Sequence, residues 1–371
     1  MTRGPVLADL TTLRVGGPVG SLIDAATEDE FLDAVRAADD SGTPLLVLGG
    51  GSNLVCSDAG FDGVVVRDRR VELSVEDDGA CGGVTVTASA GTPWSDVVSR
   101  AVDEGWVGIE ALAGIPGSVG ATPVQNVGAY GQEVADVIAS VRTWDRAEAR
   151  LRRLARSDCR FAYRSSALKA SMQLADPGGR VWRPTPRFVV LDVSFQMREG
   201  TLSAPVRYGQ LADALGIEVG ERAPLAEVRD AVLALRRSKG MVLDPDDHDT
   251  WSAGSFFTNP VLAAGDAARL PDDVPQYPAG NAAPAADAAG ASPEVVKTSA
   301  AWLIEHAGFG RGFALPGSRA ALSSKHALAI TNAGGASGDE VIALARHIRD
   351  GVRSAFGVTL EPEPVLVGVD L

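Results

Sequence analysis

Residues 44–53 read PLLVLGGGSN, a short apolar run followed at once by three glycines, a serine and an asparagine. An apolar run of this length before a turn predicts a buried strand. Successive glycines let backbone N–H groups converge on a phosphate oxygen, because no side chain stands in the way. The spacing is not G-x-G-x-x-G and no Walker lysine follows, so neither a Rossmann turn nor a P-loop fits. Two interpretations stay open: a phosphate-binding loop, or a tight turn between strands.

A second glycine-rich stretch covers residues 114–131, GIPGSVGATPVQNVGAYG. It contains the amides Gln125 and Asn126 but no lysine or glutamate. Neutral amide and backbone donors suit a diphosphate and the edge of a heteroaromatic ring. The alternative interpretation is a long surface loop. The presence of both glycine-rich stretches in one chain favours a nucleotide-type ligand.

Composition and charge narrow the class of protein. The chain has 371 residues, of which 45% are hydrophobic and 22% charged, which is typical of a globular protein of two or three domains. Its net charge of −14 argues against nonspecific binding to nucleic acid or to an anionic membrane face. We find no apolar run of membrane-spanning length and no apolar core of a signal peptide near the N-terminus. We therefore expect a cytoplasmic protein.

Cysteines and histidines are few. Cys56, Cys81 and Cys159 are odd in number and scattered, so we expect no disulfide framework and no metal site. All four histidines lie at or after His248. A flavin bound covalently through a histidine is therefore excluded for the first two thirds of the chain.

The chain changes character near residue 220. Before that point, a capping box at Thr27 and Glu30 predicts a helix, and residues 188–196 predict a strand. After it, the patterns predict an amphipathic helix over 224–239 and a long helix between Ser337 and Gly357. Residues 263–294, rich in Ala, Pro, Gly and Asp, are predicted to be a surface insertion or flexible loop.

Further motifs follow in a fixed order: CRFAYRSSALK (159–169), VRYGQL (206–211), LRRSKG (235–240), AGSFFTNP (253–260), KTSAAWLIEHAG (297–308), SKHALAITNAGGASG (324–338) and LEPEP (360–364). Together with the two glycine-rich stretches they resemble the UDP-N-acetylenolpyruvoylglucosamine reductase (MurB) family over nearly the whole chain. The resemblance implies an α+β fold: a two-subdomain FAD-binding fold of the vanillyl-alcohol-oxidase type, followed by a C-terminal α+β substrate-binding domain. Its expected boundaries are 1–70 for the first FAD-binding subdomain, with the tail 357–371 packing back, 71–220 for the second, and 221–356 for the UDP-sugar domain with the insertion at about 263–294.

The resemblance also implies an activity. NADPH would reduce non-covalently bound FAD, and the enolpyruvyl ether of UDP-N-acetylglucosamine enolpyruvate would then be reduced to the lactyl ether of UDP-N-acetylmuramate, in peptidoglycan precursor synthesis. Both reactants would use one cleft in turn, and no protein, nucleic-acid or membrane partner is implied. The alternative is another FAD-dependent oxidase or dehydrogenase of this fold, acting on a small alcohol or sugar acid.

Three catalytic positions follow from the same resemblance. Arg164 would hold the substrate carboxylate, because a guanidinium pairs bidentately with a carboxylate. Ser255 would deliver a proton to the carbanion that hydride addition leaves. Glu363, rather than the neighbouring Glu361, would sit beside that carbanion.

The expected binding residues form two sets. The first set would contact FAD from the two glycine-rich stretches: Gly49, Gly50, Gly51, Ser52, Asn53, Gly117, Ser118, Gly120, Gln125, Asn126, Gly128 and Ala129. The second set would contact the UDP-sugar: Tyr130, Tyr208, Lys239, Asn259 and Lys297. The cationic end of the helix at 236–239 would give the anionic nucleotide a basic landing place despite the negative net charge.

Overall fold

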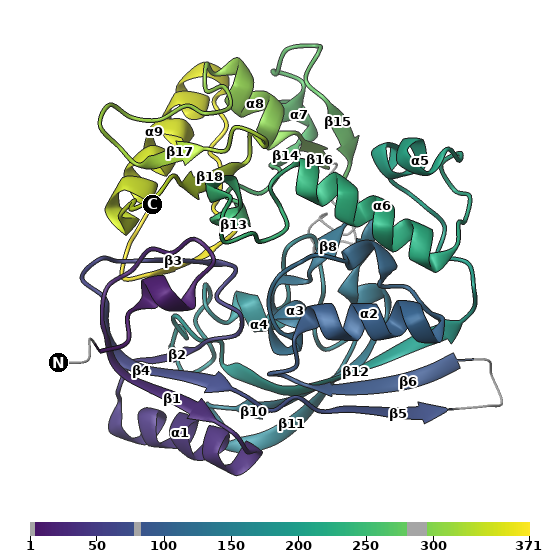
Figure 1. Ribbon diagram of the computed structural model, residues 1–371. Coiled ribbons are helices and arrows are strands. Elements are labelled where there is room, and N and C mark those ends of the chain that lie inside the picture. Colours follow the sequence, from purple (N-terminus) through teal and green to yellow (C-terminus); the bar gives the residue numbers. More distant parts are fainter. Residues whose placement is uncertain (1–3, 78–82, 280–294) are drawn as a thin grey trace. The chain divides into compact units, whose positions relative to one another are not determined.

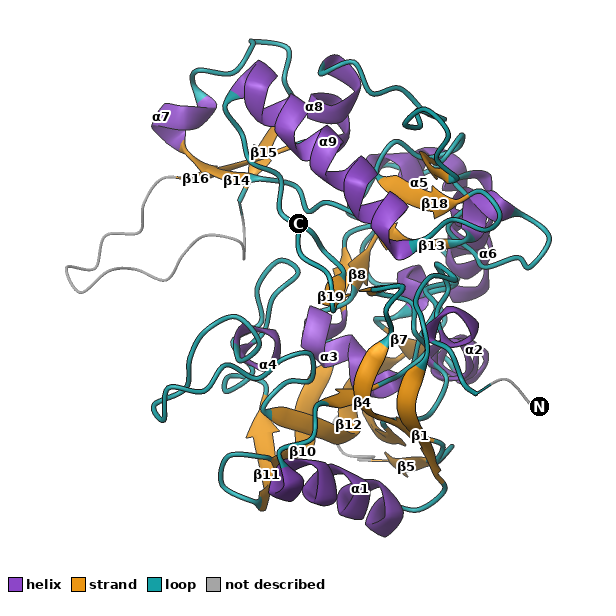
Figure 2. Ribbon diagram, turned by 90° about the vertical axis from the view of Figure 1, so that its left-hand side faces the viewer, coloured by secondary structure: helices purple, strands orange, loops and turns teal. Residues whose placement is uncertain are grey.

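A computed structural model describes residues 4–77, 83–279 and 295–371, and it divides into two compact units (Figures 1 and 2). Unit 1 takes in the chain up to Pro5, Val19–Gly51 and Phe61–Val242. Unit 2 takes in Val6–Pro18, Ser52–Gly60 and Leu243–Leu371. Two short N-terminal segments therefore fold with the C-terminal third of the chain. The domain boundaries expected near residues 70 and 220 stay predictions.

A small parallel sheet with the strand order β1-β4-β2 begins unit 1. Helix α1 packs on it, and the predicted capping box of Thr27 and Glu30 is confirmed at its start. Phe31 and Val35 face inward from α1 and are fully buried in a core that also contains Trp144 of the neighbouring sheet. The bounds are β1 Val19–Ala25, α1 Glu28–Ser41, β2 Leu45–Val47 and β4 Phe61–Asp68.

A larger antiparallel sheet, ordered β11-β10-β12-β6-β5, carries the rest of unit 1, and β7 pairs with the end of β12. Trp94 and Val97 on α2 and Val232 on α6 are buried in its main core. The longer elements are β5 Leu73–Asp77, β6 Gly83–Ser89, α2 Trp94–Glu104, β10 Ile138–Asp145, β11 Arg150–Ala155, β12 Phe188–Glu199, α5 Gly209–Leu215 and α6 Leu225–Ser238. The shorter ones are β7 Trp106–Val107, η2 Glu110–Leu112, η3 Val119–Ala121, α3 Thr122–Gln125, β8 Gly128–Ala129, β9 Gln132–Glu133, η4 Val134–Asp136 and α4 Ala167–Ala170.

Unit 2 is built around the long helix α9 and three small sheets, β13-β18-β17, β14-β16-β15 and the parallel pair β3-β19. The predicted start of α9 is confirmed, because Ser337 and Glu340 form a capping box, and Gly357 ends the helix. The elements of unit 2 are η1 Leu7–Leu10, β3 Leu54–Cys56, η5 His248–Thr250, β13 Ser252–Ser255, β14 Val261–Ala263, α7 Ala264–Ala267, β15 Gln276–Pro278, β16 Val295–Thr298, α8 Ala300–His306, β17 Ala320–Leu322, β18 Ala329–Asn332, α9 Gly338–Phe356 and β19 Val365–Val367.

The first half of the segment 263–294, interpreted as a surface insertion or flexible loop, contains regular structure. Residues 264–267 form α7, and β15 pairs with β16 from Gln276 to Pro278. Leu270 and Val274 are buried in the core of unit 2. The Ala- and Pro-rich composition hid these two apolar anchors, which are too widely spaced to produce a periodic pattern. Residues 280–294 lie outside the described residues.

The first turn of α9 lies against the backbone of the segment 52–60. A Cβ added at Gly338 would lie 2.1 Å from the carbonyl oxygen of Cys56, and the N–H of Gly338 donates to the carboxylate of Asp58 at 2.9 Å. We predict that Gly338→Ala lowers the free energy of unfolding by about 1–3 kcal/mol, the usual cost of forcing atoms into a packed site. Urea denaturation measures it. Gly310→Ala is the matched control, because a Cβ there meets nothing within 4 Å; equal stability of the two variants would contradict the close approach.

Cys56 and Cys159, the cysteines within the described residues, are both buried. Burial raises the pKa of the Cys56 thiol to about 12 and, with a smaller effect of Asp158, that of Cys159 to about 11. Only the thiolate reacts with alkylating reagents. We therefore predict that iodoacetamide at pH 8 leaves both cysteines of the native protein unmodified for hours, whereas protein unfolded in guanidinium is alkylated within minutes. Peptide mass spectrometry reads out each site. Rapid labelling of Cys56 in native protein would contradict its burial.

Candidate functional site

The two glycine-rich stretches meet in unit 1. A Cβ at Gly50 would lie 2.7 Å from Cα of Gly117, and one at Gly49 would lie 2.6 Å from Oγ of Ser118. Two backbones approach this closely only where neither carries a side chain. The second stretch is fixed in turn, because Gly120 N–H donates to the carbonyl of Ala90 at 2.9 Å. The result is a wall of closely packed backbone in which Gly49 and Gly50 are exposed, so that their peptide groups are open to a phosphate.

Gln125 and Asn126 play different parts. The Gln125 side-chain amide nitrogen is buried and has no hydrogen-bond partner among the described residues. A buried donor without a partner is costly, which fits a place where a ligand supplies the acceptor. Asn126 is fully buried, and its amide nitrogen donates to the Glu133 carboxylate and the Ala162 carbonyl, both at 2.9 Å. The structure therefore supports a ligand contact for Gln125 and a scaffolding role for the Asn126 side chain.

Arg164 lies on a tight turn that Asn126 holds. Ala162 and Ser165 exchange two backbone hydrogen bonds of 3.0 Å across this turn, and Arg164 takes the left-handed backbone conformation with φ 52°. Its guanidinium donates to the carbonyl of Gly128 at 2.7 Å. Gly128 belongs to the short β8-β9 hairpin, so the turn and the second glycine-rich stretch are joined at the guanidinium. The arginine is thus pre-positioned beside the predicted cofactor segment of the same unit.

Aromatic and cationic side chains gather at the end of α6 in unit 1. The rings of Tyr130 and Tyr208 pack edge to face with centroids 5.4 Å apart. Lys239 Nζ lies 5.7 Å from the Tyr130 ring centroid and donates to Gln210 at 2.5 Å. Three of the five predicted substrate residues are therefore in contact or near contact. The predicted cationic helix end contributes Lys239 and Arg236 to this group.

Burial tunes the titration of that group. It lowers the pKa of Arg236 to about 10, and Nε of Arg236 has no hydrogen-bond partner among the described residues. The pKa of Lys239 is lowered by burial and by the charge of Arg236. Burial, with a smaller effect of Tyr208, raises the pKa of Tyr130 against the opposing effect of Arg236. Burial disfavours the charged forms of Arg236 and Lys239, and the two positive charges repel each other. A bound anion would stabilise both charged forms.

Unit 2 brings three other predicted residues together. Strand β19 runs parallel to β3, so Val365 N–H donates to the carbonyl of Asn53 at 3.0 Å. The Asn53 amide approaches the carbonyl of Glu363 at 3.5 Å. Glu363 N–H donates to the carbonyl of Phe256, the residue after Ser255, at 2.9 Å. These hydrogen bonds hold Ser255, Glu363 and Asn53 close together, although the three residues are far apart in sequence.

Glu361 and Glu363 differ in their surroundings. The Glu361 side chain is exposed, and its carbonyl accepts from Thr258 N–H at 3.0 Å. The Glu363 side chain is half-buried. This difference supports the choice of Glu363 as the catalytic candidate.

Sequence reasoning missed His326. Its Nε2 lies 3.5 Å from Oγ of Ser255, at the outer limit of a hydrogen bond. The histidine belongs to the motif SKHALAITN. Its position next to β13 depends on the hairpin turn between β17 and β18, so only a prediction of that turn and of its pairing with β13 could have identified it. The other two predicted substrate residues are elsewhere in unit 2: Asn259 accepts from Ala300 N–H at the start of α8 at 3.0 Å, and Lys297 lies on β16.

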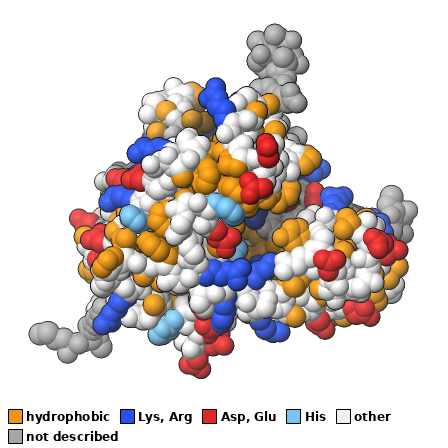
Figure 3. Space-filling view, turned by 90° about the horizontal axis from the view of Figure 1, so that it is seen from above, with side chains coloured by type: hydrophobic (Ala, Val, Ile, Leu, Met, Phe, Trp, Pro, Cys, Tyr) orange, Lys and Arg blue, Asp and Glu red, His pale blue; other side chains and the backbone are white. Residues whose placement is uncertain are grey.

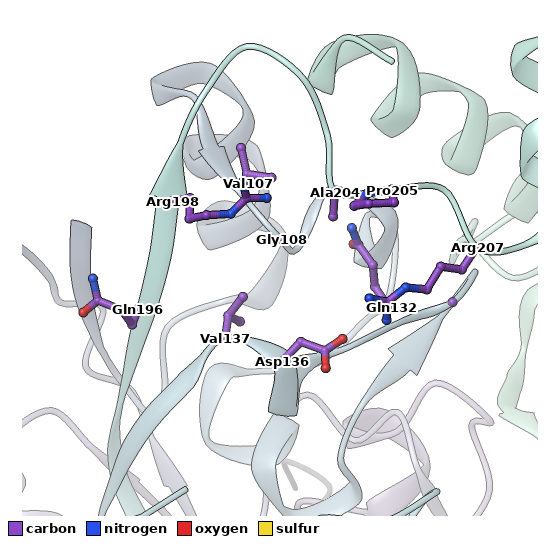
Figure 4. A pocket seen from close by; sticks show the side chains of 11 residues that line it. Val107, Gly108, Gln132, Asp136, Val137, Gln196, Arg198, Ala204, Pro205 and Arg207 are labelled. Carbon is purple, nitrogen blue, oxygen red and sulfur yellow. The ribbon is translucent and has the colours of Figure 1, made fainter. Parts of the chain in front are cut away.

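A pocket of about 410 Å³ opens in unit 1 beside the loop that carries Tyr208 (Figure 4). Figure 4 shows Gln132, Asp136 and Arg207 pointing toward one another in it. The fully buried Glu110 carboxylate fixes its walls, since it accepts from Gly108 N–H, Gln132 Nε2 and Ala204 N–H at 2.7–2.8 Å. None of these residues was predicted as functional.

Acidic and basic side chains are interspersed on the face that Figure 3 shows. No helix within the described ranges has the length and apolar character needed to cross a bilayer. The same residues contain no group of three or more His, Cys, Asp or Glu side chains placed to hold a metal ion.

Comparison with known proteins identifies the family. Residues 21–155 match the family model described as FAD binding domain, and residues 244–367 match the C-terminal domain of UDP-N-acetylenolpyruvoylglucosamine reductase. The chain is 52% identical to the reductase of that name from Cutibacterium acnes over 98% of its own length and 89% of the relative's. It belongs to the UDP-N-acetylenolpyruvoylglucosamine reductase family. A second member, from Thermobifida fusca, is 50% identical over the whole chain and 98% of the relative.

A solved structure shares the fold. The crystal structure of the MurB reductase from Thermus caldophilus covers 98% of this chain and 97% of its own, with a TM-score of 0.61 at 23% identity. The family and the fold class expected from the motifs are confirmed. Both glycine-rich stretches lie within the segment that matches the FAD-binding model, so FAD is confirmed as the cofactor. The individual contacts to FAD, substrate and reacting atoms stay predictions.

The close approach of the two glycine-rich stretches gives a prediction for FAD binding. We expect Gly50→Ala to weaken FAD affinity roughly tenfold or more, equivalent to about 1.4 kcal/mol, because its methyl group would push the stretches apart. Quenching of flavin fluorescence by the apoprotein measures the affinity. Gly209→Ala is the matched control, since a Cβ there meets nothing within 4 Å. Unchanged affinity of Gly50→Ala in a stably folded protein would contradict the role of this wall.

Proposed function

We propose that this protein reduces the enolpyruvyl ether of UDP-N-acetylglucosamine enolpyruvate to the lactyl ether of UDP-N-acetylmuramate, with NADPH as the hydride donor. Family membership supports the substrate class. The observation that carries the chemistry is the pairing of Ser255 and Glu363 through the backbone of Phe256 in unit 2. Bound FAD supplies hydride transfer from NADPH to the outer vinyl carbon; the chain's own residues do the rest.

Arg164 binds and polarises the substrate carboxylate. Hydride addition to the outer carbon leaves negative charge on the inner carbon and on the carboxylate that is conjugated with it. A guanidinium spreads its positive charge over two N–H groups that match the two carboxylate oxygens. One N–H of Arg164 donates a hydrogen bond to the carbonyl of Gly128, which fixes the plane of the guanidinium. The arginine therefore meets the developing charge without reorganising.

Ser255 protonates the inner carbon. A serine hydroxyl is a weak acid, so it transfers its proton only to a strong base such as this carbanion and only away from bulk water. Ser255 is half-buried at the end of β13. Glu363, beside it, stabilises the enol form of the intermediate and helps to complete the proton transfer.

The UDP moiety binds at the tyrosine and cation cluster. The positive charges of Lys239 and Arg236 attract the diphosphate, Tyr208 closes over the substrate from an exposed loop, and the Tyr130 ring supports the ring of Tyr208. Asn259 and Lys297 are two further proposed contacts to the substrate. Because a UDP-sugar and NADPH are the proposed reactants, we also propose that the enzyme works in the cytoplasm.

A second candidate, an FAD-dependent oxidase of a small alcohol or sugar acid, does not account for Ser255. Oxidation of an alcohol removes a proton and a hydride from the substrate, so it needs a base rather than a proton donor. The cationic cluster on α6 likewise has no partner in an uncharged alcohol.

The division of labour predicts an uneven effect of Ser255→Ala. We expect reduction of the bound flavin by NADPH to proceed at nearly the wild-type rate. Reoxidation of the reduced enzyme by the enolpyruvyl sugar should slow by roughly 10²–10⁴-fold, the range for loss of a positioned acid. Anaerobic stopped-flow absorbance at the flavin band measures both steps. Ser95→Ala, at an exposed serine, is the control. Equal losses in both steps would contradict the proton-donor role.

A further inference from the structure

We propose that His326 is the positioning residue of Ser255: its Nε2–H donates a hydrogen bond to the serine oxygen, aims the hydroxyl proton at the substrate and stabilises the alkoxide as the proton leaves. The inference rests on the proposed function and deepens it. All the groups that carry it lie in unit 2.

The backbone brings the two residues together. Ser255 ends β13, and its register partner on the antiparallel strand β18 is Ala329. His326 lies three residues before Ala329, in the turn between β17 and β18, and its carbonyl accepts from Ala329 N–H at 3.1 Å. The turn therefore folds over the end of β13, where Nε2 comes to 3.5 Å from Oγ.

The turn is held by more hydrogen bonds than a simple hairpin connection needs. Ser323 is fully buried, and its oxygen accepts from the N–H groups of Lys325 and His326 at 3.0 and 3.3 Å. Asp249 accepts from Ser323 Oγ at 2.8 Å and from both the N–H and the hydroxyl of Ser324.

The lysine of the same turn is fixed as well: Lys325 Nζ donates to Asp247 at 2.5 Å. Aspartates of η5 and its N-cap thus clamp the turn on one side while β18 holds it on the other. A clamp of this kind fixes the imidazole relative to Ser255, which is what a positioning role requires.

The chemistry decides which group donates. In serine hydrolases the hydroxyl donates to the imidazole, which turns the serine into a nucleophile. Here the hydroxyl proton has to reach carbon, so it must point away from the histidine. The serine oxygen then accepts from Nε2–H, and the same pair of side chains favours an acid instead of a nucleophile.

The proton transfer moves one proton from Ser255 to the substrate. The Oγ–H bond of Ser255 breaks and a C–H bond forms at the inner carbon, so the negative charge moves from the substrate to Oγ. The Nε2–H of His326 holds that charge through a hydrogen bond to an anion, which is stronger than one to a neutral oxygen. After the product leaves, the alkoxide takes a proton from water.

Two substitutions at His326 separate a donor from a mere space filler. We expect His326→Leu to slow reoxidation of the reduced enzyme by the enolpyruvyl sugar by about 10²-fold, as loss of one donor to an oxyanion does. Reduction by NADPH should be unaffected. His326→Gln, whose amide N–H reaches a similar position, should recover most of the loss. A leucine variant as fast as wild type, or a glutamine variant as slow as the leucine variant, would overturn the proposal.

A double substitution tests whether His326 acts through Ser255. The variant Ser255→Ala/His326→Leu should be no slower than Ser255→Ala alone, because the histidine has no oxygen left to serve. Additive losses would show that His326 acts independently. The wild-type enzyme separates the two levels of the argument: if its reduced form is not reoxidised by the enolpyruvyl sugar, the proposed function fails, whatever the variants show.

A measurement without turnover completes the test. The chain has only four histidines, so ¹⁵N NMR of histidine-labelled full-length protein resolves each ring, and His326→Gln assigns the signal. We expect His326 Nε2 to carry a proton in the wild type and its shift to change in Ser255→Ala. An unprotonated Nε2 would overturn the direction of the hydrogen bond.

Discussion

The parallel pairing of β19 with β3 is the constraint on which the catalytic part of unit 2 depends. It returns the C-terminal tail to residues 54–56 and leaves the Glu363 N–H to bond the carbonyl beside Ser255. Backbone hydrogen bonds set the spacing of the two catalytic candidates, so it does not rely on the rotamers of long side chains. Helix α9 supports the arrangement, because its first turn packs against the backbone carbonyl of Cys56 and donates to the carboxylate of Asp58.

Unit 1 uses a different device, the exclusion of side chains. Gly50 and Gly117 let two loops touch, and the backbone N–H groups there form the surface predicted to bind the anionic cofactor. The buried amide of Asn126 then links this surface to Arg164, because it donates a hydrogen bond to the carbonyl of Ala162 in the turn that carries Arg164. The predicted cofactor segment and the turn that carries Arg164 are therefore joined through one buried side chain.

Much of this could be predicted from the sequence because local patterns carry it. The capping boxes of α1 and α9 and the glycine-rich stretches are short-range signals, and the ordered motifs point to the family. Contacts across the sequence could not be predicted. His326 lies in the motif SKHALAITNAGGASG, but nothing in the motif relates it to Ser255; only the β17-β18 turn places its Nε2 3.5 Å from Oγ of Ser255. Leu270 and Val274 are buried, but their burial could not be predicted, because two isolated apolar residues in an Ala- and Pro-rich segment show no periodic pattern.

The most direct test of the proposed chemistry is a crystal structure of Ser255→Ala with FAD and UDP-N-acetylglucosamine enolpyruvate bound in the absence of NADPH, because the oxidised flavin then has no hydride to transfer and the substrate stays intact. We expect the substrate carboxylate on the Arg164 guanidinium, and the inner vinyl carbon in contact with the side chains of residue 255 and Glu363. An enolpyruvyl group bound away from residue 255, or a carboxylate held by cations other than Arg164, would contradict it.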